Sequence, residues 1–168
     1  AYSLDGEKWF RVILNAPEQP LNAAASDGEL YLAVGSVPSL VVTTNQLEWG
    51  RYLALYQLEC YSCHSKDFTT NNYLEPEKSE GFFAGGNLMQ GFEGMKFPSR
   101  NLTPDETTGI GKWTEEQFIK AVKFGLRDGK PALRYPMLPY SQLTDSEAKA
   151  IFTYLKTVPK ITHQVPEM

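Results

Sequence analysis

The segment CYSCH, residues 60–64, holds both cysteines of the 168-residue chain and one of its two histidines. Thiol and imidazole groups at this spacing can bind zinc, form a redox-active thiol pair or close a local disulfide. Zinc needs four ligands, but this segment offers at most three, and the other histidine, His163, lies far along the chain. A thioredoxin-like pair begins a helix within a βαβ unit, whereas here a helical pattern precedes the motif. These three interpretations are therefore the weaker ones.

The same segment matches C-x-x-C-H, the signature of covalent haem c attachment. Two intervening residues place the thiols at the spacing of the two haem vinyl groups, and the next residue can bring its imidazole under the iron. We therefore predict one haem c attached through Cys60 and Cys63, with His64 as a metal ligand. Because so short a pattern also arises by chance, the rest of the chain has to support it.

An electron-carrying haem c needs a second axial ligand, usually methionine or histidine. The candidates are Met89, Met95, Met137, Met168 and His163. Met137 lies between Pro136 and Pro139, which stiffen the loop, and a final helical pattern follows it. Any methionine can instead simply fill a core. We predict Met137 as the sixth ligand of the iron.

Three helix starts are marked by a cap residue followed three positions later by Glu or Gln. These pairs are Asn45 with Glu48, Thr114 with Gln117 and Thr144 with Glu147. The first helix is expected to run into CYSCH, the second to end at Gly125 or Gly129, and the third to stop before Pro159. Apolar stripes support the last two helices; their members are Phe118, Val122 and Leu126, then Ile151, Tyr154 and Leu155.

Two regions differ from this helical pattern. Residues 66–112 carry seven of the thirteen glycines and are expected to be loop-like around a flat cofactor. Residues 1–45 hold three short β-like runs, KWFRVILN, ELYLAVG and SLVVTT, with the connector APEQPLNAAASDG after the first. We therefore expect an extended or hairpin-like arm over residues 1–45 and a cofactor-binding domain over residues 46–168.

Composition narrows the classes of function. The net charge of −4 gives no reason to expect nucleic-acid binding, and no run of about 18 apolar residues exists that could span a membrane. The chain begins AYSLDGEKWF without a signal-peptide pattern, so a mature or trimmed form is expected. Membrane association would then come only through a partner or through an anchor absent from this chain.

Several motifs in the right order resemble a class I (monohaem) cytochrome c, and especially the bacterial modules that accompany membrane dehydrogenases. They are GRYL at 50–53, CYSCH, AGG at 84–86, NLTPDETTGIGKWTEEQF at 101–118, YPMLPY at 135–140 and LTDSEAKAIFTYL at 143–155. The commoner family loop has its methionine one place later, where this chain has Leu138. The resemblance covers about two-thirds of the chain, and residues 1–45 lie outside it.

The resemblance implies a mainly α class I fold around one covalent haem c, with the N-terminal arm added to it. It implies that Asn101 and Trp113 line the haem propionates, and Arg100 joins them by its charge. It also implies that Tyr135 and Tyr140 flank the methionine side. Trp113 could instead be a core aromatic residue, and Arg100 a solvated surface residue. Gly50 and Tyr154 are expected at the crossing of the first and last helices.

The function this implies is a single-haem electron carrier that cycles between Fe(III) and Fe(II) and is not an enzyme. The implied partners are redox proteins: a donor dehydrogenase or quinol-oxidising complex, and an acceptor oxidase or other cytochrome. Residues 96–134 carry a net charge of +3 and residues 46–95 one of −4, which favours a weak, salt-sensitive encounter.

Two alternatives stay open. The chain could be an electron-transfer subunit that its arm docks into a larger respiratory complex. It could also be a small-ligand-binding or peroxidatic haem protein with an open sixth site. Because haem is attached covalently outside the cytoplasm, the periplasm or the outer face of the cytoplasmic membrane is the expected location.

Overall fold

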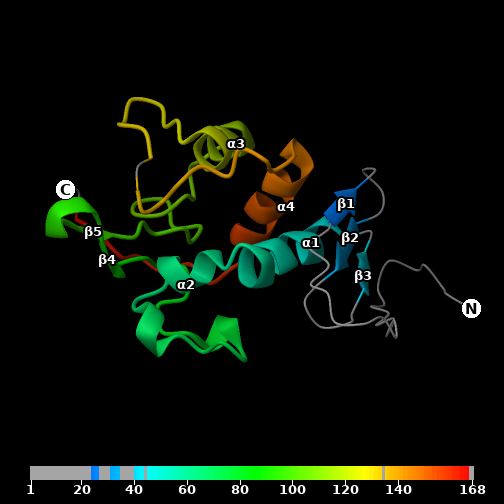
Figure 1. The fold of residues 1–168 in the computed structure, drawn as a ribbon, viewed down its shortest axis with the longest axis horizontal. Coiled ribbons are helices and arrows are strands. Elements are labelled where there is room, and N and C mark those ends of the chain that lie inside the picture. Colours follow the sequence, from blue (N-terminus) through cyan, green and yellow to red (C-terminus); the bar gives the residue numbers. More distant parts are fainter. Residues whose placement is uncertain (1–23, 27–30, 35–39, 44, 134, 167–168) are drawn as a thin grey trace, which may run out of the picture. The chain divides into compact units, whose positions relative to one another are not determined.

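The computed structural model describes residues 24–26, 31–34, 40–43, 45–133 and 135–166 (Figure 1). The chain divides into two compact units, Ala1–Trp49 and Gly50–Met168. The division falls inside helix α1, Gln46–Tyr52, a few residues after the predicted end of the arm at residue 45. Each unit is considered by itself below.

The described part of the first unit contains a three-stranded antiparallel sheet in the order β1-β2-β3. The strands are β1 (Ala24–Ser26), β2 (Tyr31–Val34) and β3 (Leu40–Thr43). The register pairs Ala24 with Ala33 and Tyr31 with Thr43. Strands β2 and β3 fall within the second and third β-like runs of the sequence, and β1 falls in the expected connector. The first run, residues 8–15, lies outside the described residues.

The helix before the motif starts where it was predicted, because the Asn45 side chain accepts a hydrogen bond from the Leu47 amide at 3.0 Å. The prediction that one helix runs unbroken into CYSCH is wrong. Helix α1 passes into a π-helix, η1 (Leu53–Gln57), and the chain then breaks at Glu59, whose φ is 49°, before α2 (Cys60–His64). The π-turn buries three successive side chains, residues 53–55, which an α-helical period would spread around the helix.

The two later helices confirm the predicted starts. Helices α3 (Glu115–Phe124) and α4 (Asp145–Leu155) both begin with complete capping boxes, and α3 ends at Gly125 with φ 71°. They pack together through Phe118 and Phe152, whose rings lie 5.2 Å apart. The α4 stripe is buried as predicted, but Leu126 lies past the end of α3 and is exposed, so its place in the α3 stripe was wrong.

Helix α4 crosses the first helix at Gly50, as predicted. A Cβ atom at Gly50 would lie 1.8 Å from the carbonyl oxygen of Ala150, so the two backbones meet directly. Tyr154, one turn further along α4, approaches Glu77 at 3.4 Å, and Glu77 accepts a bidentate pair from Arg51 at 2.7 and 2.9 Å.

The segment between α2 and α3 has more structure than the loop that was predicted. It holds three 3₁₀ turns, of which η2 (Phe68–Thr70) and η3 (Pro76–Lys78) precede an antiparallel hairpin and the third lies within it. The hairpin joins β4 (Leu88–Gln90) to β5 (Lys96–Pro98) through η4 (Phe92–Gly94). Strands this short carry no usable alternation in the sequence, which explains why they were missed. Among the helices of the described residues, none combines the length and apolar character needed to cross a bilayer.

We predict that Gly50→Ala lowers the free energy of unfolding by about 3 kcal/mol, because the new methyl group meets backbone atoms that cannot move aside. Denaturant unfolding monitored by circular dichroism measures the change. Gly129→Ala is the control, because it is also a glycine-to-alanine change but its new methyl group meets no atom within 4 Å. It should lose only the strain energy of its φ of 66°, about 1 kcal/mol. Equal losses in the two variants would contradict the close crossing.

Candidate haem-attachment site

The imidazole of His64 is held in one orientation. Its side chain is 7% exposed, and its Nδ1 lies 2.8 Å from the backbone carbonyl oxygen of Arg100. Since the carbonyl can only accept, Nδ1 carries the proton and Nε2 presents its lone pair. Nε2 is buried and has no hydrogen-bond partner among the described residues. Burial lowers the pKa of His64, which keeps the ring neutral, as a metal ligand must be.

The two cysteines precede this histidine on the single turn of α2. Cys60 is half-buried and Cys63 is exposed, and neither is in a disulfide. Burial raises the pKa of Cys60 to about 12, the opposite of the lowered pKa that activates a redox-active thiol pair. Among the described residues, no group of three or more His, Cys, Asp and Glu side chains is arranged to hold a metal ion. The raised thiol pKa argues against a redox-active pair at CYSCH.

Two backbone segments fix the position of His64. The amide of Gly85 donates to the carbonyl of His64 at 2.7 Å, and the amide of Gly86 donates to the carbonyl of Ser99 at 2.9 Å. Gly85 has φ 73°, and a Cβ atom there would lie 2.6 Å from the backbone of Arg100. Only glycine permits this approach, which explains the AGG motif and brings the Arg100 carbonyl to the imidazole.

The loop that carries Met137 is anchored on α3. The amide of Leu133 donates to Gly125 at 2.7 Å and that of Tyr140 to Val122 at 2.8 Å. Burial raises the pKa of Tyr140, and the thiols of Cys60 and Cys63 add to the shift, so this hydroxyl lies within electrostatic reach of the motif. This links Tyr140 to the motif, and Met137 itself stays a predicted ligand.

Within this loop Met137 is half-buried, whereas Leu138 is 58% exposed. Of the other candidates for the sixth ligand, Met89 lies on β4 and Met95 follows the hairpin turn. The His163 imidazole contacts the carbonyl of Ala84 at 3.1 Å. Met168 lies outside the described residues.

The residues predicted at the propionates lie in different settings. Asn101 is buried; its amide nitrogen donates to Thr108 and to the Ile161 carbonyl, and its oxygen accepts two bonds from Thr103. The Arg100 guanidinium donates to the carbonyls of Val165 and Pro166 at 3.3 and 3.0 Å. Both side chains therefore tie the C-terminal segment to this loop, and their contact with propionates stays a prediction.

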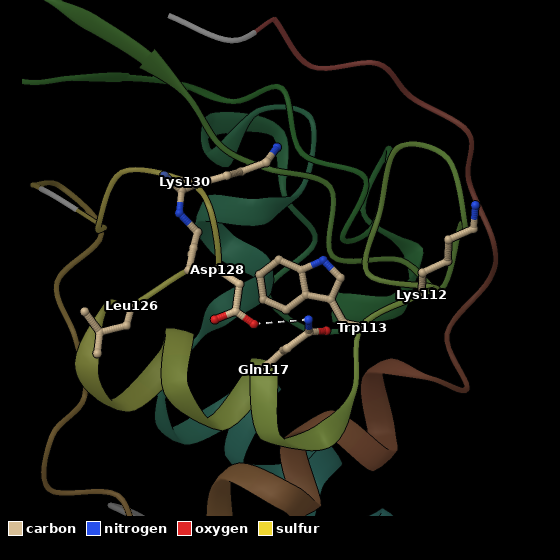
Figure 2. Close-up of a pocket in the computed structure, with 7 residues that line it drawn as sticks. Lys112, Trp113, Gln117, Leu126, Asp128 and Lys130 are labelled. Carbon is tan, nitrogen blue, oxygen red and sulfur yellow. Dashed lines mark hydrogen bonds between the residues drawn. The ribbon is translucent and has the colours of Figure 1, made fainter.

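Trp113 lies in a cavity of about 250 Å³ beside α3 (Figure 2). Figure 2 shows its indole in the middle of the lining, between the segment before α3 and the loop after it. Residues lining the cavity include Lys112, Gln117, Leu126, Arg127, Asp128 and Lys130. Gln117 donates to Asp128 at 3.3 Å across the lining. Three basic side chains against one acidic one make the wall of this cavity predominantly positive.

Sequence reasoning missed Asp105, which organises the loop after Asn101. Its carboxylate accepts from the hydroxyls of Thr107, Thr162 and Thr108 at 2.7 to 2.8 Å and from the Thr108 amide at 2.7 Å. These bonds, led by the one from Thr107, hold the pKa of Asp105 well below its ordinary range. The run D-E-T-T is a local signal for such a turn, but the distant partner Thr162 has none. The carbonyl role of Arg100 was also missed, because a backbone acceptor leaves no signature in side-chain type.

The residues present fit a covalently bound haem. A buried imidazole nitrogen, which no described residue contacts as a hydrogen-bond partner, belongs to the histidine that follows two thiols in C-x-x-C-H spacing, and the opposite nitrogen is fixed by a carbonyl. This is the arrangement by which proteins orient a ligating histidine. A helical domain with such a turn is a haem-attachment domain.

The chain belongs to the cytochrome c family, because the family's sequence model, described as cytochrome c, matches residues 53–159. A cytochrome c domain implies covalently bound haem c, and Cys60, Cys63 and His64 form its attachment motif. The predicted resemblance to dehydrogenase-associated cytochromes is confirmed by the similar proteins.

The fructose dehydrogenase cytochrome subunit of Gluconobacter japonicus is 38% identical over 150 residues, which is 83% of this chain and 28% of that protein. The gluconate 2-dehydrogenase cytochrome c subunit of Pantoea cypripedii is 36% identical over 133 residues, which is 74% of this chain and 27% of that protein. The cytochrome c subunit of alcohol dehydrogenase (quinone) of Gluconobacter oxydans is 29% identical over 146 residues, which is 84% of this chain and 27% of that protein. The chain spans little more than a quarter of the length of these relatives.

We predict that acid destabilises this protein in part through Asp105. A carboxyl whose pKa is lower in the folded chain than its unfolded value of about 3.9 stabilises the fold above about pH 4 and loses that effect as the pH falls further. Asp105→Asn should therefore flatten the fall of the unfolding free energy between about pH 5 and 2.

Denaturant titrations at a series of pH values measure this slope. Glu93→Gln, an exposed change in the hairpin turn, is the control and should keep the wild-type slope. Glu77 retains its own lowered pKa, due first to its hydrogen bond with Arg51, so some slope persists in the Asp105 variant. An Asp105→Asn slope equal to that of the control would rule out this carboxyl as a source.

Proposed function

We propose that this chain is a monohaem electron carrier in which His64 and Met137 bind the iron from opposite sides. The observation that carries the proposal is the buried Nε2 of His64, which has no partner within the described part of the chain, opposite an Nδ1 fixed by the Arg100 carbonyl. An imidazole held in this way is a permanent ligand, because its ring can neither rotate nor change tautomer without losing a buried hydrogen bond.

The case for Met137 rests on the placement of its loop. Both ends of the loop are bonded to the C-terminal part of α3, and Tyr140 lies within electrostatic reach of the two cysteines. Met137 is more buried than Leu138, the residue that occupies the position of the methionine in the commoner family loop. Met89 and Met95 belong to the hairpin instead.

The haem supplies the chemistry, a one-electron change at iron, and the chain controls it. A histidine–methionine ligand pair raises the reduction potential relative to two nitrogen ligands, since thioether sulfur favours the reduced ion. The protein forms no bond with a substrate in this scheme, and its task is to hold the ligands still while an electron passes. We therefore propose an electron-transfer protein without catalytic residues of its own.

We further propose that the positively lined cavity at Trp113 receives the haem propionates. Carboxylates complement its basic side chains, and an indole N–H that faces a cavity can donate to such an acceptor. Asn101 and Arg100 would then act on the propionates only indirectly, because their side chains form hydrogen bonds with the C-terminal segment.

The partners we propose are a donor dehydrogenase or quinol-oxidising complex and an acceptor oxidase or cytochrome. Support comes from the relatives, which are cytochrome subunits of fructose, gluconate and alcohol dehydrogenases. Attachment to such a complex, with residues 1–45 as the docking arm, is compatible with the same redox role. The periplasm or the outer face of the cytoplasmic membrane is the proposed location.

Optical spectra test the ligand assignment. We predict that the wild type is low-spin in both oxidation states and shows the weak sulfur-to-iron band toward the red end of the oxidised spectrum. Met137→Ala should lose this band and lower the reduction potential, because the thioether that favours Fe(II) is gone.

Met95→Ala is the matched control, since Met95 is 51% exposed on the hairpin and should leave band and potential unchanged. A high-spin wild type, or a band that survives Met137→Ala, would overturn the proposed ligand pair. The high-spin result would bring the alternative of an open, small-ligand-binding iron to the front.

A further inference from the structure

The last described residues of the chain run back across the site. After α4, residues 159–166, named here the C-terminal strap, leave the helix and pass toward the β4–β5 hairpin (Figure 1). The strap contains no helix or strand, and its Val165 side chain is 4% exposed. What holds the strap is a set of polar contacts to the two backbone segments that fix His64.

The first set of contacts reaches the loop that supplies the acceptor of His64. The guanidinium of Arg100, the residue whose own carbonyl faces His64, donates to strap carbonyls at Val165 and Pro166. The next residue, Asn101, donates to the strap carbonyl of Ile161 at 2.8 Å. Thr162 donates to Asp105 at 2.7 Å, further along the same loop.

The second set reaches the glycine turn on the other side of the histidine. The His163 ring lies 3.1 Å from the carbonyl of Ala84 in this turn, while its amide donates to Thr108 of the first loop at 3.0 Å. The same ring covers Gly86, where a Cβ atom would come within 2.7 Å of it. Between Ala84 and Gly86 lies Gly85, whose amide binds the His64 carbonyl.

We propose that the C-terminal strap is a positioning element for the iron ligand: it holds the Arg100 carbonyl against His64 Nδ1 and so sets how strongly His64 donates to iron. The inference rests on the proposed function, namely that His64 ligates haem iron. A firm Nδ1–H bond to a carbonyl raises the basicity of the opposite nitrogen, and a more basic ligand stabilises Fe(III). Loosening the strap therefore raises the reduction potential.

The contacts allow a test that leaves the ligands and the predicted propionate residues unchanged. Thr162→Val removes the hydroxyl that binds Asp105 at nearly constant shape, and His163→Ala removes the ring that rests on Ala84 and Gly86. Both are combined in the full haem-loaded chain. Thr157→Val is the matched control, because it deletes a threonine hydroxyl that donates to the nearby carbonyl of Tyr154 at 2.7 Å, outside the strap.

Two readouts are measured: the reduction potential, and the hydrogen exchange of the His64 Nδ1–H proton by NMR in the reduced, diamagnetic state. We expect the double variant to favour Fe(II) by about tenfold, which is a rise of about 59 mV for a one-electron couple. Its Nδ1–H proton should also exchange faster than in the wild type. Each single variant should show a smaller change of the same sign, and Thr157→Val none.

A loss of unfolding free energy with unchanged potential and unchanged exchange would overturn the proposal, because the strap would then be structural only. That result would leave the proposed function intact, since the wild type would still be a low-spin haem protein. A wild type without covalent haem, or without His64 on the iron, would overturn the proposed function and this inference with it.

Discussion

The hydrogen bond between His64 Nδ1 and the Arg100 carbonyl is the constraint on which the domain depends. It decides the tautomer of the imidazole, and through the tautomer it decides which nitrogen faces the iron. The surrounding contacts keep His64 Nδ1 and the Arg100 carbonyl oxygen within hydrogen-bond distance. The glycine turn at 84–86 brings the two backbones close enough, and the buried Asn101 and Asp105 side chains hold the acceptor loop in one conformation.

The helices have the complementary task of fixing the motif itself. The close crossing with α4 at Gly50 sets where the chain leaves α1 and enters η1, and the pairing of Arg51 with Glu77 ties α1 to the segment after the motif. The left-handed residue Glu59 then separates α2 from the helix before it. The attachment turn is thus a short unit of its own, positioned by contacts on both sides and not by continuation of a long helix.

Much of this could be predicted from the sequence, because the signals are local. The cap pairs at Thr114 and Thr144 gave correct starts for α3 and α4, and C-x-x-C-H indicated the chemistry of the site. What failed depended on tertiary contacts. The break at Glu59 and the hairpin at 88–98 have no strong local pattern, and Leu126 was assigned to a stripe that its helix ends before reaching. The hydrogen-bond acceptor of His64 is a main-chain carbonyl oxygen, so it could not be predicted from the type of any residue.

The C-terminal strap also bears on the order in which the fold can form. The His64–Arg100 hydrogen bond spans 36 residues of sequence, whereas the Asp105–Thr162 hydrogen bond spans 57. Contacts between residues so far apart form late in folding, because closing the loop loses chain entropy before the contact stabilises the fold. The imidazole of His64 therefore reaches its final environment only when residues 159–166 fold back onto the loop.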